Sequence, residues 1–109
     1  MKIYKELYVG EELRDKRDDV IEKLMKNEIQ WSVYLILLGN HENSQLELVN
    51  SMYLAYDLFP RKDVLVVGIA KGKGQAMELT REIVDDIYSE TKQLDIRHYL
   101  LNRQNSNDA

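Results

Sequence analysis

The stretch Val64-Leu65-Val66-Val67-Gly68-Ile69-Ala70, followed by Lys71-Gly72-Lys73-Gly74, decides the fold of this chain. A run so apolar and so rich in β-branched residues predicts a strand over residues 63–70 in the middle of a sheet. The glycines and lysines that follow are typical of a tight turn. Residues 75–91 then carry apolar side chains at helical spacing, which predicts an amphipathic helix. Strand, turn and helix together are the building unit of an α/β fold.

The N-terminal third repeats this alternation. Residues 3–9 alternate between Ile3, Leu7 and Val9 on one face and Tyr4, Glu6 and Tyr8 on the other, which predicts a strand exposed on one side. After Gly10, residues 11–27 show an apolar stripe at helical spacing and predict a helix. Residues 30–38 are apolar on both faces, which predicts a strand buried on both sides.

Two further elements complete the expected fold. Ser44-Gln45-Leu46-Glu47 fits the capping-box pattern, which predicts that residues 45–58 form a helix. Residues 94–101 alternate again and predict a last strand, with His98 on it. Residues 102–109 are polar, and we expect them to form a disordered tail after a single domain over residues 1–101.

The predicted order is β-α-β-α-β-α-β, which favours an α/β fold with a mostly parallel four-stranded sheet and crossover helices. The second and third strands are the most apolar and should be central, with the first and fourth at the edges. This order resembles small flavodoxin-like and Rossmann-like domains over roughly residues 3–101. The alternative is a ferredoxin-like α+β fold, β-α-β-β-α-β, in which the second helix is only an insertion.

Composition narrows the classes of function. The 109 residues carry a net charge of -4, which argues against a nucleic-acid binder and against docking on anionic lipid. Cysteine is absent, so disulfides and thiolate chemistry are excluded. The longest wholly apolar run, residues 33–38, is too short for a membrane span, and the start of the chain lacks a signal-peptide pattern. We therefore expect a cytoplasmic protein.

The strongest candidate site is the segment from Gly68 to Gly74. Its glycines let a backbone approach a phosphate, the following helix offers free N–H groups, and Lys71 and Lys73 add positive charge. The pattern departs from both the Walker A loop and the dinucleotide fingerprint, so the alternative interpretation is a structural turn with solvated lysines. In the binding hypothesis, a phosphorylated small molecule or nucleotide contacts Gly68, Lys71, Gly72, Lys73 and Gly74, and His41 or Asn43 completes the pocket.

Catalysis has weaker support in the sequence. His41, which is followed by the carboxylate Glu42, could act as an acid or a base at neutral pH, but no Ser or Lys nucleophile is indicated beside it. The adjacent pair Asp85-Asp86 diverges around its helix, so we interpret it as a solvated face. No metal-ligand spacing occurs, and we expect no catalytic residue, no metal and no cofactor.

Residues 31–60 contain three acidic residues and neither lysine nor arginine, in a chain that is otherwise dense in charge. Their aromatic and methionine side chains could form a surface for a partner or belong to the core: Trp31, Tyr34, Met52, Tyr53 and Tyr56. So few charges over this length favour burial between two copies. The leading hypothesis is therefore a non-enzymatic interaction or accessory module acting as a homodimer, and the alternative is the phosphate or nucleotide binder described above.

Overall fold

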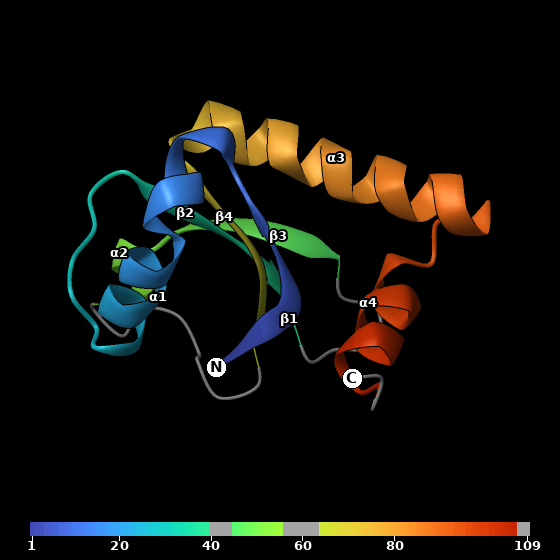
Figure 1. The fold of residues 1–109 in the computed structure, drawn as a ribbon, viewed down its shortest axis with the longest axis horizontal. Coiled ribbons are helices and arrows are strands. Elements are labelled where there is room, and N and C mark those ends of the chain that lie inside the picture. The colour runs from blue at the N-terminus through green and yellow to red at the C-terminus, as the bar shows by residue number, and fades with distance from the viewer. Residues whose placement is uncertain (40–44, 56–63, 107–109) are drawn as a thin grey trace.

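The computed structural model describes residues 1–39, 45–55 and 64–106 (Figure 1). Its strands are β1 (Lys2–Val9), β2 (Val33–Leu38), β3 (Leu46–Asn50) and β4 (Leu65–Lys71). Its helices are the 3-10 helix η1 (Glu11–Lys16), α1 (Arg17–Met25), α2 (Met52–Ala55), α3 (Lys73–Thr91) and α4 (Ile96–Gln104). Together they form one α+β domain with a single four-stranded sheet.

The sheet has the strand order β1-β4-β2-β3 and is mixed. β4 pairs parallel with β1, whereas β2 pairs antiparallel with both β4 and β3. The prediction of a mostly parallel sheet is therefore wrong, although β2 and β4 are central as expected and β1 lies at an edge. The ferredoxin-like alternative comes closer, because β2 and β3 are consecutive antiparallel neighbours there too, but the expected last strand is a helix.

The predicted helix over residues 45–58 is wrong for most of its described part. Residues 46–50 form β3, and only the short helix α2 follows it. Leu46 and Leu48 pack against the core on the α3 side, while Val49 is buried in the core on the opposite side. This alternation, together with pairing to β2 along the whole strand, prevailed over the capping-box signal because backbone pairing in a sheet can override local propensity. Residues 56–58 lie outside the described residues.

The predicted strand over residues 94–101 is also wrong, because residues 96–104 form α4. The Asp95 side chain accepts a hydrogen bond from the backbone N–H of His98 at 3.2 Å and so caps the first turn. Leu100 is completely buried against the sheet, which fixes the helix in place. The helix continues through Gln104, so the segment expected to be a disordered tail begins as helix. Residues 107–109 lie outside the described residues.

The core consists of two layers of side chains, one on each face of the sheet. α3 and α4 cover one face, and η1 and α1 cover the other (Figure 1). Pairing of β4 with β2 skips one residue at Val67, which is a β-bulge in the middle of the sheet. Within the described ranges, no helix is both long enough and apolar enough to cross a membrane.

Candidate functional site

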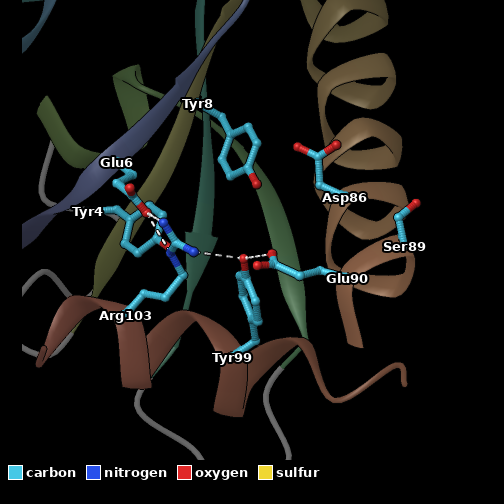
Figure 2. Close-up of a pocket in the computed structure, with 8 residues that line it drawn as sticks. All are labelled: Tyr4, Glu6, Tyr8, Asp86, Ser89, Glu90, Tyr99 and Arg103. Carbon is cyan, nitrogen blue, oxygen red and sulfur yellow. Dashed lines mark hydrogen bonds and ion pairs between the residues drawn. The ribbon is translucent and has the colours of Figure 1, made fainter. Parts of the chain in front are cut away.

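A pocket of about 540 Å³ opens between β1, α3 and α4 (Figure 2). This volume lies in the range of pockets that hold small molecules. We call it the tyrosine pocket, and the residues that line it are Tyr4, Glu6, Tyr8, Asp86, Ser89, Glu90, Tyr99 and Arg103. The pocket combines three phenol rings with four charged groups, which come from residues 4–8 near the start of the chain and residues 86–103 near its end.

β1 supplies one wall because its side chains alternate. Tyr4, Glu6 and Tyr8 share one face of the strand, and this is the face that α3 and α4 cover. Tyr4 is only 2% exposed and belongs to the core, while Tyr8 is partly buried and Glu6 is exposed. The sequence predicts a strand exposed on one side, and this face carries both the exposed Glu6 and the buried Tyr4, since the residues expected to form the last strand pack over it as α4.

α4 supplies the opposite wall through Tyr99 and Arg103, which are one helical turn apart. The Nε atom of Arg103 donates a hydrogen bond to Oε2 of Glu6 at 2.5 Å, and a second guanidinium nitrogen forms an ion pair with the same oxygen. Nη1 of Arg103 donates to the Tyr99 hydroxyl at 3.1 Å. These contacts join α4 to β1 and leave the only guanidinium in the pocket already engaged.

α3 contributes the carboxylates of Asp86 and Glu90, also one turn apart (Figure 2). The Tyr99 hydroxyl donates a hydrogen bond to Oε2 of Glu90, and this bond raises the pKa of Tyr99 above its ordinary value. Burial, and then the neighbouring Asp86 carboxylate, raise the pKa of Tyr8. Both phenols are protonated at neutral pH, and that of Tyr99 donates its hydrogen bond to the Glu90 carboxylate.

The charge of the tyrosine pocket is negative, because three carboxylates face one guanidinium. Glu6 is bound to Arg103, and Glu90 accepts the Tyr99 hydroxyl. Asp86 has no ion-pair partner among the residues that the structure describes. In those residues no group of histidine or carboxylate side chains has the arrangement that would hold a metal ion.

The sequence-predicted glycine–lysine segment lies elsewhere, where β4 ends and α3 begins. Gly68 is buried inside β4, where an added Cβ atom would meet Ile36 and Leu79. Gly72 has a φ of +80°, which favours glycine, and its N–H donates to the Ser32 carbonyl at 2.7 Å.

The two lysines of that segment have different surroundings. Lys71 is the exposed last residue of β4, and its Nζ lies 3.8 Å from a carboxylate oxygen of Glu12. Lys73 and Gly74 form the first turn of α3, whose N-terminus has no side-chain cap. His41 and Asn43, expected to complete this pocket, lie outside the described residues.

A third feature, which we call the aromatic end, comprises the exposed Trp31 and Tyr53 and the partly buried Met52, from two segments that are hydrogen-bonded to each other. Trp31 is 72% exposed and Tyr53 is 51% exposed, so neither is a core residue. Ser51 joins their two segments, because its hydroxyl donates to the Gln30 carbonyl at 3.0 Å and its N–H donates to the Val33 carbonyl at 2.9 Å. Tyr34, by contrast, packs partly buried on the α3 side of the core, and Tyr56 lies outside the described residues.

Sequence reasoning missed the tyrosine pocket as a site. The signals were the alternation of Tyr4, Glu6 and Tyr8 and the spacing of four between Tyr99 and Arg103. These two signals could not be combined, because residues 94–101 were expected to form a strand, in which Tyr99 and Arg103 would not lie one helical turn apart. Asp86, interpreted as part of a solvated face, is exposed as expected but lines the pocket.

Comparison of the chain with known protein families, with curated protein sequences and with solved structures found no match.

Proposed function

We propose that this protein is a non-enzymatic interaction module that forms a homodimer through the aromatic end. The observation that carries the proposal is the exposure of Trp31, because a tryptophan that is 72% exposed leaves a large apolar surface in water. Tryptophan and tyrosine are also the residues that contribute most strongly to protein interfaces. Cysteine is absent from the chain, and the sequence indicates no nucleophile beside a base, which supports a role other than catalysis.

Charge favours a second copy of the chain as the partner. The net charge of -4 makes two copies repel each other over most of their surfaces. Residues 31–60 contain neither lysine nor arginine and only three acidic residues, so this segment itself adds little repulsion between two copies. A symmetric dimer places the same patch on both subunits, which a self-complementary apolar surface permits.

Sedimentation-velocity ultracentrifugation over a concentration series tests this proposal. We expect the wild-type chain to sediment as a dimer and Trp31→Ala to weaken the association at least tenfold, because a central tryptophan commonly contributes 2 kcal/mol or more. Tyr88→Ala is the matched control, since Tyr88 is 48% exposed on α3 outside the aromatic end. A wild-type chain that stays monomeric at several hundred micromolar, or an equal effect of both variants, would overturn the proposal.

The second candidate function is binding of a phosphate or nucleotide at the residues Lys71, Gly72, Lys73 and Gly74. One observation favours it: the N-terminus of α3 has no side-chain cap, and the space that a Cβ atom of Gly74 would occupy is open. Backbone N–H groups there are available to an anion, and the helix dipole favours one. The nearby Glu12 carboxylate opposes it by neutralising part of the charge of Lys71.

Amide NMR titration with inorganic phosphate and with ADP separates this candidate from the first. Binding should shift the amide signals of residues 71–75, and the double variant Lys71→Ala/Lys73→Ala should remove the shifts without changing stability. If neither ligand shifts these signals at millimolar concentration, the segment is only a structural connection between β4 and α3.

A further inference from the structure

We propose that the tyrosine pocket binds a small aliphatic amine in its protonated, cationic form. The ammonium group is placed between the carboxylates of Asp86 and Glu90, and the methylene groups lie against the rings of Tyr8 and Tyr99. This inference does not depend on the homodimer, because every residue that it uses belongs to one copy of the chain.

The first argument is electrostatic. The pocket holds three carboxylates and one guanidinium, and that guanidinium is bound by Glu6 and Tyr99. An anionic ligand would have to compete with Glu6 for Arg103 and would face two further carboxylates. A cationic ligand would instead be attracted by the carboxylate of Asp86, which lacks an ion-pair partner in the described part of the chain.

The second argument comes from α3 itself. Asp86 and Glu90 are four residues apart, and like charges at this spacing repel each other and destabilise a helix. Figure 2 shows both side chains extending from α3 toward the space beside Tyr8 and Tyr99 rather than diverging. A cation between them would relieve this repulsion and so stabilise the arrangement.

The third argument is the aromatic lining, which distinguishes an organic cation from a metal ion. Tyrosine rings attract ammonium groups through their π-faces and bury methylene groups at the same time. Arg103 already uses the Tyr99 ring in this way, with its guanidinium carbon 5.5 Å from the ring centroid. Within the described residues no carboxylate cluster has a metal-binding arrangement.

The spacing of the carboxylates along α3 favours an amine that carries more than one ammonium group. Glu82 precedes Asp86 by four residues and lines a neighbouring pocket of about 260 Å³ on the same side of α3. Four residues advance a helix by about 6 Å, a distance that three or four methylene groups span. The cationic Arg14 also lines that neighbouring pocket, so Glu82 is a weaker anchor for an ammonium group than Asp86.

Amide NMR titration with spermidine tests the proposal, with 1,4-butanediol as the uncharged probe and magnesium chloride at matched ionic strength as the inorganic one. We expect spermidine to shift the signals of Tyr8, Asp86, Glu90 and Tyr99 with saturation below millimolar concentration. The diol and the magnesium salt should leave these signals in place. Absence of saturable shifts with spermidine up to 10 mM, or the same shifts with magnesium, would overturn the proposal.

Neighbouring aspartates on α3 provide a matched pair of variants. Asp86→Asn removes a carboxylate from the pocket, whereas Asp85→Asn makes the same change of charge at an exposed position that does not line it. Asp86→Asn should weaken spermidine binding at least fivefold, and Asp85→Asn should change it less than twofold. Equal effects of the two variants would show attraction by net charge alone and would contradict a built site.

Discussion

The tyrosine pocket and the aromatic end are both built from aromatic side chains, but polar and charged groups surround the rings in the pocket and are few at the aromatic end. In the pocket, Tyr99 and Arg103 have hydrogen-bonded or charged partners, and the rings stand beside carboxylates. At the aromatic end, Trp31 and Tyr53 are exposed in a stretch with few charges. The difference indicates that one region is suited to a small charged ligand and the other to a large apolar surface.

The two regions also differ in how the chain assembles them. The pocket joins β1 to α4, segments from opposite ends of the sequence. At the aromatic end, the Gln30–Val33 turn is hydrogen-bonded to Ser51, which lies only about twenty residues further along the sequence. Changes that loosen α4 should therefore disturb the pocket and leave the aromatic end intact.

Of the substitutions that test this difference between the two regions, Leu100→Ala is expected to have the largest effect on stability. Leu100 is completely buried between α4 and the sheet, and such a truncation typically costs about 3 kcal/mol of unfolding free energy. Urea unfolding measures this cost, and Leu94→Ala is the control because Leu94 is 68% exposed. If the two variants unfold at the same urea concentration, α4 does not contribute to the core as described.

A smaller effect is expected from Gly68→Ala in the bulged part of β4. The added Cβ atom would lie 3.0 Å from Cδ1 of Ile36 and 3.2 Å from Cδ2 of Leu79, on the face that α3 covers. Side chains must shift to admit it, which costs about 1–2 kcal/mol. Gly74→Ala is the matched control, since its Cβ atom meets open space and a helical alanine should be neutral or stabilising. Thermal unfolding of both variants measures the contrast, and equal melting temperatures would contradict it.

How much of the fold could be predicted from the sequence depends on how strongly each segment's own pattern indicates its structure. Residues 30–38, 63–70 and 75–91 carry strong apolar periodicity, and the elements expected there are present as β2, β4 and α3. The segments that became β3 and α4 are short and ambiguous. Their structure depends on partners: β3 on pairing with β2, and α4 on the burial of Leu100.

The candidate sites divide in the same way, into those whose residues lie close together in the sequence and one whose residues lie far apart. The glycine–lysine segment was visible because its residues are consecutive, and it does connect β4 to α3. The exposed Trp31 and Tyr53 were visible because they lie in one charge-poor stretch. The tyrosine pocket was not visible, because Glu6 and Arg103 are brought together only by the packing of α4 against β1. Contacts across the whole chain are set by tertiary packing rather than by local pattern.

The next largest effect is a loss of stability at high pH, which we expect from Tyr8 in the tyrosine pocket rather than from the aromatic end. Because the folded pKa of Tyr8 is raised, the unfolded chain loses this proton first as pH rises above about 10. Stability is therefore lost as pH rises above the ordinary tyrosine range, by up to about 1 kcal/mol between pH 10 and 11 from this group. Tyr8→Phe should reduce that loss and match the wild type near pH 7. Parallel wild-type and variant curves of urea midpoint against pH would contradict the raised pKa.

The smallest effect is expected from the ion pair between Glu6 and Arg103. Both side chains are about half exposed, so the pair should contribute less than about 1 kcal/mol despite its close geometry. A double-mutant cycle with Glu6→Gln and Arg103→Gln isolates this coupling, and 1 M NaCl should reduce it because salt screens exposed charges. Arg103→Gln also removes the only cation from the pocket, so it should tighten spermidine binding while it slightly lowers stability. Loss of spermidine binding in this variant would mean that Arg103 holds the pocket open, and the pocket would then depend on this surface pair rather than on buried Leu100.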